Sequence, residues 1–248
     1  MKRVVRNIAN YPAGKLKIAE TGMSSGSYYT LRQEFDHILR FRAPAVPLRH
    51  YPLDNPWHRW AKRGADVAIS LLVIAGLLSW LTPLIALLIR LDSRGPVFFL
   101  QKRNKRNGKL FTCLKFRSMI INTDADILPA AKNDKRITRM GRFLRDHYLD
   151  ELPQFINVLV GDMSVIGPRP HMVSDNIRYD ELISDYSYRH KVKPGITGLA
   201  QVMGYTGVAE NLGMMKERVN MDIFYVRHWS MKMDIAVFVH TLARAIGL

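Results

Sequence analysis

The sequence of 248 residues has a single cysteine, Cys113, and few acidic residues, with 21 aspartates and glutamates against 37 lysines and arginines. One cysteine excludes an internal disulfide and a cysteine-rich zinc site, so we expect a reducing, cytosolic environment. We interpret Cys113 as a small, buried apolar residue. The shortage of acidic residues leaves a net charge of +16, which predicts an anionic partner: nucleic acid, acidic lipid headgroups or a phosphorylated substrate.

Several motifs of known enzyme classes are also missing. The sequence has no Walker-type phosphate loop and no GxGxxG dinucleotide-binding fingerprint. Its histidines lack the spacing of zinc ligands, such as HExxH. The basic first residues are not followed by an apolar run of signal-peptide length, so we expect no secretory signal. Any catalytic chemistry must therefore come from other residue types.

The composition divides the chain into three parts. Residues 1–56 hold scattered prolines and no lasting apolar period, and we interpret them as an N-terminal extension that lies on the main domain or on a membrane. We assign residues 57–94 to a membrane helix region and residues 95–248 to a catalytic domain. A chain of this length can bury a sizeable core.

Residues 67–89 contain no charged side chain, and basic residues flank both ends. The length is that of a membrane helix. Pro83, which follows Thr82, removes a backbone donor and clashes with the preceding turn, so we expect a kink or break close to these two residues. A re-entrant helix that returns to the same membrane face satisfies both observations. A straight span and a buried helix of a soluble protein remain alternatives.

After the apolar run, two β-prone segments flank a basic loop at residues 101–109, which predicts a hairpin. Lys115 and Arg117 lie two positions apart in its second arm. Side chains with this spacing share one face of a strand. We therefore treat both cations as candidates for binding an anionic substrate.

Two adjacent carboxylates, Asp150 and Glu151, follow a run of arginines that includes Arg145 and precede Arg169 in a Gly-Pro-Arg-Pro turn. A carboxylate can attack phosphorus or hold a divalent metal, and guanidinium groups pair with phosphate oxygens. Pro153 is compatible with the first turn of a helix, which would place the carboxylates at or just before a helix N-terminus. Ordinary salt bridges at a solvated helix end are the alternative.

The last third of the sequence combines a loop rich in glycine and proline, at residues 190–207, with two helical patterns. The second pattern, residues 231–246, is apolar enough to lie against a membrane or to pack as a core helix. The mixture of hairpin, short strands and helices predicts a mixed α/β fold rich in helices.

Taken together, the motifs resemble one family, the bacterial sugar transferases, which are monotopic phosphoglycosyl transferases acting on polyprenyl phosphate. The resemblance covers roughly residues 57–246. It depends on the order and spacing of five segments: KRGAD, the proline-containing apolar helix after it, GPVFFLQKRNKRNGKLFTCLKFRSM, RITRMGRFLRDHYLDELPQFINVLVGDMSVIGPRP and VKPGITGLAQV.

The resemblance implies transfer of a sugar 1-phosphate from a UDP-sugar to undecaprenyl phosphate, with release of UMP. In the family the aspartate of the pair is the nucleophile and forms a covalent phosphosugar intermediate, while the glutamate serves an essential Mg²⁺ ion. These roles fall to Asp150 and Glu151 here. The residues implied or expected to bind phosphate or substrate are Lys115, Arg117, Arg145, Arg169 and Tyr205.

The resemblance also implies interfacial amphipathic helices and an active site on the cytoplasmic face of the inner membrane. No apolar span precedes residue 57, so the chain looks like the short form of the family, without a multi-span N-terminal domain. We expect membrane, donor and acceptor as partners, and no nucleic acid. A membrane-tethered basic protein that binds nucleic acid or acidic lipid without catalysis is the competing interpretation.

One position departs from the family pattern. Many members have Gly-Arg-Asn after the Ala-Gln-Val segment, where this sequence has Gly204, Tyr205 and Thr206. The arginine helps to bind the nucleotide sugar in those members. The variant is closer to members that initiate exopolysaccharide with glucose 1-phosphate, so UDP-glucose is the first expected donor, ahead of UDP-galactose and N-acetylated sugars.

Overall fold

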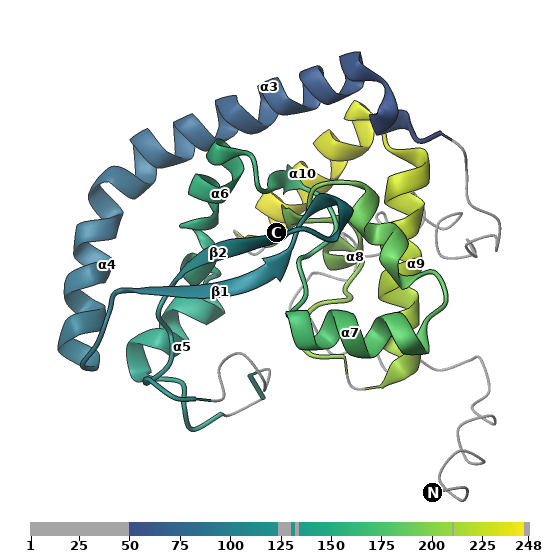
Figure 1. Ribbon diagram of the computed structural model, residues 1–248. Coiled ribbons are helices and arrows are strands. Elements are labelled where there is room, and N and C mark those ends of the chain that lie inside the picture. The colour runs from purple at the N-terminus through teal and green to yellow at the C-terminus, as the bar shows by residue number, and fades with distance from the viewer. Residues whose placement is uncertain (1–49, 124–129, 132–133, 210, 246–248) are drawn as a thin grey trace, which may run out of the picture.

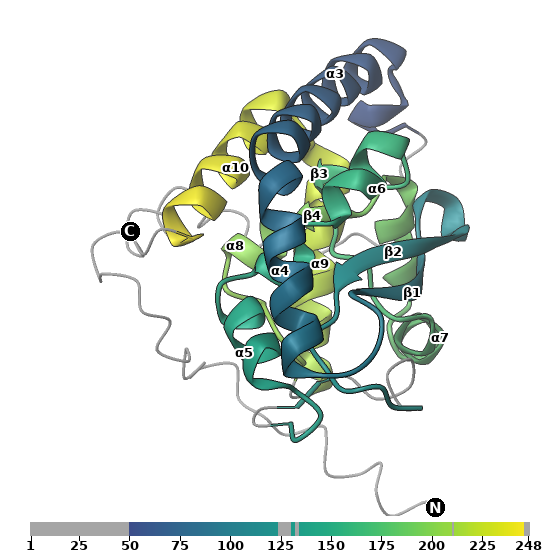
Figure 2. The ribbon, with the colours of Figure 1, turned by 90° about the vertical axis from the view of Figure 1, so that its left-hand side faces the viewer.

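The computed structural model describes residues 50–123, 130–131, 134–209 and 211–245. Most of the predicted N-terminal extension, residues 1–49, lies outside this part of the chain. The described chain is rich in helices and has two small two-stranded sheets. The predicted mixed α/β class is therefore confirmed, and Figures 1 and 2 show the arrangement of the elements.

A long apolar helix runs along one side of the molecule. Its first part, α3 (Pro56–Val73), begins where the Asn55 side chain accepts a hydrogen bond from the Trp57 amide, as a helix cap does. A π-helical segment (Ile74–Leu78) follows, and then α4 (Ser79–Asp92). Figure 1 shows that α3 crosses the top of the domain and that α4 descends at an angle to it.

The irregular part of this helix lies one turn before the predicted position. Pro83 is inside α4, and the helix does not break at Thr82 or Pro83. A proline disturbs the turn on its N-terminal side, and the π-helical segment ends four residues before Thr82. Two side chains donate hydrogen bonds to carbonyl groups of this widened turn. Ser79 Oγ donates to the Ala75 carbonyl at 2.7 Å, and Trp80 Nε1 donates to the Gly76 carbonyl at 2.9 Å.

The predicted hairpin is confirmed. Strands β1 (Phe98–Asn104) and β2 (Leu110–Phe116) pair antiparallel, with Gln101 opposite Cys113. Asn107 and Gly108 in the turn both have positive φ, a conformation that asparagine and glycine adopt most readily. Cys113 is 1% exposed, as its interpretation as a buried apolar residue requires.

Strands β3 (Ser164–Ile166) and β4 (Gly195–Thr197) form a short parallel pair. The chain after β3 passes so close to β4 that only glycine fits: a Cβ atom on Gly195 would lie 2.2 Å from the Gly167 nitrogen. This packing fixes the turn that carries Arg169. The remaining helices are α5 (Arg139–Asp146), α6 (Gln154–Val160), α7 (Val173–Leu182), α8 (Leu199–Val202), α9 (Leu212–His228) and α10 (Met231–Ala245).

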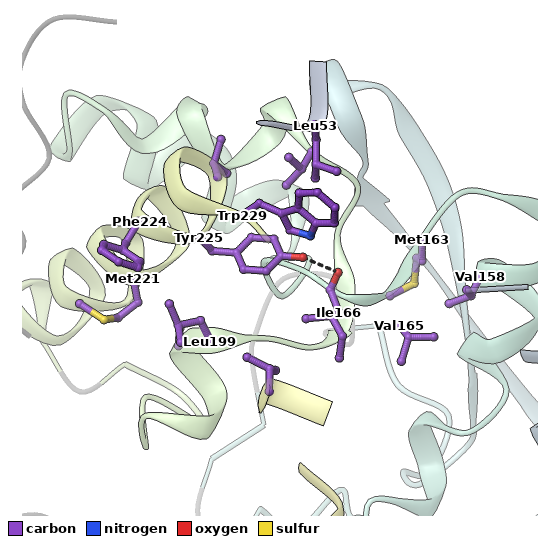
Figure 3. Close-up of a cluster of buried hydrophobic side chains, with 14 of the residues drawn as sticks. Leu53, Val158, Met163, Val165, Ile166, Leu199, Met221, Phe224, Tyr225 and Trp229 are labelled. Carbon is purple, nitrogen blue, oxygen red and sulfur yellow. Dashed lines mark hydrogen bonds between the residues drawn. The ribbon is translucent and has the colours of Figure 1, made fainter. Parts of the chain in front are cut away.

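The main hydrophobic core joins α9 to β3, α6 and the hairpin (Figure 3). Within it, the Tyr225 hydroxyl donates to Asp234 Oδ1 at 2.8 Å and lies 3.2 Å from the Ile166 carbonyl oxygen. Asp234 Oδ2 accepts from Lys62 at 2.6 Å and from Trp229 Nε1 at 3.0 Å. This buried cluster ties α3 to α9 and α10.

A broad apolar surface remains outside the core. The helix Pro56–Asp92 is long and apolar enough to cross a membrane, and only 17% of its most apolar window is buried. A core helix of a soluble protein would be mostly buried. The last helix, α10, buries Val237 and exposes one apolar face, formed by Ile235, Val239 and Leu242.

Candidate active site

A cavity of about 860 Å³ opens beneath the hairpin. Its walls come from β1, β2, α5, α7, α9 and α10, segments that lie far apart in the sequence. Six of the seven residues predicted to form the site line it: Lys115, Arg117, Arg145, Asp150, Glu151 and Arg169. The fold therefore brings the predicted carboxylates and cations to one cavity.

Asp150 and Glu151 lie in a 3-10 turn (Leu149–Glu151), just before α6, as predicted. Pro153 is the residue that precedes α6 rather than part of its first turn. Tyr148, which introduces the turn, has a φ of 56°, in the left-handed region that few non-glycine residues adopt. Such backbone conformations persist where the surrounding structure enforces them, often at functional sites.

Glu151 is held by two cations. Its carboxylate accepts a hydrogen bond from Lys115 Nζ at 2.8 Å and from both terminal nitrogens of Arg169, one of them at 2.7 Å. Burial alone would raise the pKa of Glu151, but the charges and hydrogen bonds of Arg169 and Lys115 outweigh burial and hold the pKa well below its usual range. Glu151 is therefore ionised over the whole physiological range.

Asp150 is buried, at 7% exposure, and its carboxylate makes no hydrogen bond within the described chain. Burial and the neighbouring charge of Glu151 raise the pKa of Asp150 to about 6, although Lys115, Arg145 and Arg169 act in the opposite direction. At neutral pH the carboxylate is mostly ionised and its oxygens are uncommitted. Such a group can act as a nucleophile, a base or a metal ligand.

A buried network supports Arg169 from behind. Arg189 donates to the Arg169 carbonyl at 2.6 Å, to the Tyr186 hydroxyl at 3.1 Å and to Asp222 at 2.8 Å. These groups are almost fully buried. Since each has a partner, the network holds the Arg169 backbone in one position.

Arg117 has a different position from the one that strand periodicity predicts. Strand β2 ends at Phe116, and the Arg117 guanidinium donates to the carbonyls of Ser93 and Arg94, both at 2.7 Å. It thereby fastens the segment after α4 to the hairpin. Its role in substrate binding stays a prediction, as do the assigned roles of the other site residues.

Tyr205 is the one predicted site residue that does not line the cavity; it packs against the main core. The next two residues, Thr206 and Gly207, do line the cavity, and their carbonyls accept hydrogen bonds from the buried Arg218 at 3.3 and 3.0 Å. Arg218 is not among the predicted site residues. Its position in the predicted helix, next to Val219 and three residues after Met215, places a cation on the apolar face, which could have indicated a buried or functional arginine.

The donor set limits which metal could bind. The described residues hold no group of three or more histidine, cysteine, aspartate or glutamate side chains suited to a metal ion. Asp150 and Glu151 supply two adjacent carboxylates. Mg²⁺ commonly binds through one or two carboxylates, its own waters and substrate phosphates, so this site fits Mg²⁺ better than zinc.

Comparison with known proteins gives consistent matches over the same region. The family model described as "Bacterial sugar transferase" matches residues 57–247. The chain is 46% identical over 200 residues to a UDP-glucose:undecaprenyl-phosphate glucose-1-phosphate transferase of Klebsiella pneumoniae, a match that covers 80% of this chain and 43% of the relative.

Shorter relatives match as well. A protein of the same name from Caulobacter vibrioides is 42% identical over 182 residues, which cover 73% of this chain and 68% of the relative. The exopolysaccharide production protein PSS of Rhizobium leguminosarum is 42% identical over 188 residues, or 73% and 92%. The chain spans less than half the length of the Klebsiella relative. On these matches, the chain belongs to the bacterial sugar transferase family.

Proposed function

We propose that this chain transfers a sugar 1-phosphate from a UDP-sugar to undecaprenyl phosphate, releases UMP and thereby begins the synthesis of exopolysaccharide or another glycoconjugate. The names of the Klebsiella and Caulobacter relatives support this reaction class, and the name of the Rhizobium relative supports a role in exopolysaccharide production. The observation that carries the proposal is the position of Asp150. It is a buried carboxylate with uncommitted oxygens, placed among three cations in a cavity.

The proposed reaction has two displacements at one phosphorus. An Asp150 oxygen attacks the phosphorus that bears the sugar, and the bond from that phosphorus to the oxygen of UMP breaks, so UMP leaves. An oxygen of the lipid phosphate then attacks the same phosphorus, and the bond to Asp150 breaks. The carboxylate is regenerated, and the sugar 1-phosphate remains on the lipid.

The cations have separate parts in this proposal. Lys115 and Arg169 are engaged with Glu151, so they orient it and contribute positive charge near the transferring group. Arg145 acts on Asp150 through its charge but forms no ion pair among the described residues. Its guanidinium is therefore available to the substrate phosphates.

Glu151 is the group that would hold Mg²⁺, beside the substrate phosphates and next to the nucleophilic Asp150. When bound, the ion would supply charge neutralisation on the phosphate oxygens. Arg169 and Lys115 hold the pKa of Glu151 well below its usual range, so Glu151 offers an anionic ligand at neutral pH. Removal of divalent ions with a chelator should abolish turnover, and added Mg²⁺ should restore it.

We also infer that the bent helix α3–α4 is re-entrant and holds the cavity at the cytoplasmic face of the inner membrane, with α10 lying at the interface. The angle between α3 and α4 (Figure 1) and the exposed apolar surface support this arrangement. Arg59 and Arg94 are exposed near the two ends of the helix. Cysteines placed there should react from the same side of sealed vesicles; opposite accessibility would show a full span.

UDP-glucose is the proposed first donor, because Tyr205 stands where other members have an arginine, and because the names of two relatives specify UDP-glucose. A panel of UDP-sugars in a UMP-release assay would rank the donors. A rate with UDP-galactose or an N-acetylated sugar that exceeds the rate with UDP-glucose would overturn this choice.

The decisive experiment measures UMP release by the full chain in detergent, with Mg²⁺, a UDP-sugar and polyprenyl phosphate. Asp150→Asn should lower the rate on the order of 10⁴-fold or more, as loss of a nucleophile does. Asp146→Asn is the matched control, because Asp146 is exposed and lies outside the cavity. An active Asp150→Asn enzyme would refute the mechanism; salt-dependent DNA binding without UMP release would favour the binding-protein alternative.

A further inference from the structure

A second cavity, of about 310 Å³, lies at the beginning of α3 and shares no lining residue with the candidate active site. We call it the basic pocket. Its walls come from the start of α3, the hairpin turn and the segment before β4. Six cationic side chains line it: Arg59, Lys62, Arg63, Arg106, Lys191 and Lys193.

The positive charge of the basic pocket is only partly neutralised from within. Its one lining carboxylate, Asp66, accepts hydrogen bonds from Ser164 Oγ and from the Val165 amide, both at 2.9 Å. Lys62 is paired with Asp234. Arg106 lies 3.9 Å from an Asp54 oxygen, and its buried Nε has no hydrogen-bond partner in the described chain.

Two of the cations, Lys193 and Arg63, lie close to Gly161 and to each other. A Cβ atom on Gly161 would lie 3.5 Å from Lys193 Nζ and 3.8 Å from an Arg63 terminal nitrogen. Arg63 donates to the carbonyls of Val158 and Leu159, whereas Lys193 and Arg59 form no ion pair or hydrogen bond through their side chains in the described chain. Burial and the charge of Arg63 lower the pKa of Lys193. A bound anion would relieve this repulsion.

The rim of the basic pocket is aromatic. Trp60 lines it and is 73% exposed, and Trp57, one helical turn earlier, is 78% exposed. Indole rings are enriched at membrane–water interfaces because they combine an apolar body with a hydrogen-bond donor. The helix that starts here continues directly into the apolar segment. Phosphate near this rim would therefore belong to a lipid.

We propose that the basic pocket binds the phosphodiester headgroup of an anionic phospholipid and anchors the start of α3 at the bilayer surface. Lys193, Arg59 and Arg63 would donate to the phosphate oxygens, while Trp60 would lie against the lipid beside them. The inference rests on the membrane association in the proposed function. It adds a lipid site separate from the cavity that would take donor and acceptor.

The test is a titration of the purified full chain in detergent with short-chain phosphatidylglycerol, followed by tryptophan fluorescence. Parallel titrations use short-chain phosphatidylcholine, inorganic phosphate and UMP. We expect phosphatidylglycerol alone to give a saturable change in tryptophan fluorescence. UMP would bind in the candidate active site, whose described lining residues include no tryptophan, so a UMP-induced change equal to that of phosphatidylglycerol would overturn the proposal. Equal binding of phosphatidylcholine would overturn the proposal, and inorganic phosphate binding with the same affinity would show a site for a soluble anion instead.

Matched variants assign the binding to the pocket. The double variant Lys191→Gln/Lys193→Gln should weaken phosphatidylglycerol binding roughly thirtyfold. The control Lys109→Gln/Lys216→Gln removes the same charge from exposed positions outside both cavities, and should change binding less than about threefold. Equal loss in both variants would show a general charge effect and overturn the proposal.

Two further measurements separate the possible failures. Arg59→Gln, at an exposed position, should weaken binding without a change in melting temperature, so a folding defect in the lysine variant cannot imitate the result. UMP release by Lys191→Gln/Lys193→Gln, measured in detergent with saturating substrates, should match that of the unmodified chain. The lipid titration does not require catalysis, so absence of UMP release would reject the proposed function and leave the lipid result standing.

Discussion

Asp150 in the cavity and Asp234 at the junction of α3 and α10 are both 7% exposed, yet their surroundings are opposite. Asp234 accepts hydrogen bonds from Lys62, Tyr225 and Trp229. Asp150 accepts none within the described chain, and burial together with Glu151 raises its pKa to about 6. Buried polar groups are normally hydrogen-bonded, so Asp150 is the exception that requires an explanation.

Burial alone therefore does not distinguish a structural carboxylate from a reactive one. The number of hydrogen-bond donors around the carboxylate distinguishes the two. A fully paired carboxylate is a structural part of the fold, because removal of one partner leaves the other charge buried without a counter-charge. An unpaired one destabilises the fold and is retained for another reason, such as reaction with a substrate. Four predictions test this contrast, from the largest expected effect to the smallest.

Asp234→Asn should destabilise the protein by about 3 to 5 kcal/mol, because it leaves Lys62 buried without its counter-charge. Denaturant unfolding in detergent measures the change. Asp162→Asn is the control, since the pair of Asp162 with Lys105 is more exposed and such pairs contribute about 1 kcal/mol or less. Equal effects of the two substitutions would mean that the cluster around Asp234 is not a structural brace.

Asp150→Asn should have the opposite effect on stability. Because the folded-state pKa is raised, the folded protein keeps this proton up to about pH 6, whereas an unfolded aspartate loses it near its ordinary pKa of 3.8. The free energy of unfolding therefore falls as pH rises through this window. At pH 8 the variant should be more stable by up to about 3 kcal/mol.

The gain from Asp150→Asn should disappear below about pH 4, where the carboxyl is protonated in both states. Unfolding of the variant and the unmodified chain at pH 8 and at pH 4 provides the measurement. A variant that is less stable at pH 8 would show that the Asp150 charge is favourable in the fold, contrary to the comparison.

Arg169→Lys should lower kcat/KM for UMP release roughly 10- to 100-fold. Arg169 donates to Glu151 through two nitrogens, and a lysine cannot form this bidentate interaction. Arg178→Lys changes another cation of the same cavity wall that is not bonded to the carboxylates. It should have an effect of less than about threefold; equal losses would mean that the cavity needs only positive charge.

The rate of UMP release should fall on the acid side with an apparent pKa of about 6, to roughly a tenth at pH 5. The reason is that protonation removes the nucleophilic form of Asp150. Full recovery on return to pH 8 distinguishes titration from unfolding. A rate that stays constant from pH 8 to pH 5 would contradict the raised pKa.

Some features could be predicted because they are local. The carboxylate pair, the cationic turn at Arg169 and the hairpin with Lys115 all depend on neighbouring residues, spacing and turn chemistry. The long uncharged run was visible for the same reason. It predicts a kink or break close to Thr82 and Pro83, whereas the irregular π-helical turn lies at Ile74–Leu78. The Ser79 and Trp80 side chains donate to carbonyls of that turn.

Other features depend on contacts between distant segments. The spacing of Lys115 and Arg117 predicts that both side chains share one strand face. Strand β2 ends at Phe116, however, and Arg117 donates to two carbonyls in the segment after α4. The place of Tyr205 in a motif predicts a role in substrate binding, whereas the cavity is lined by the two residues after it and by Arg218 from α9. No local pattern could show that Arg189 would support Arg169 from behind.

The sequence by itself determined the residue types of the site, the hairpin, the apolar helix and, through the order of its motifs, the family. Only the tertiary structure decided which carboxylate is paired. Asp150 and Glu151 are adjacent carboxylates that the sequence alone does not distinguish. Lys115 and Arg169 both donate to Glu151, and no described residue donates to the Asp150 carboxylate. The physical reason is that pKa values depend on burial and on charges brought together from distant segments.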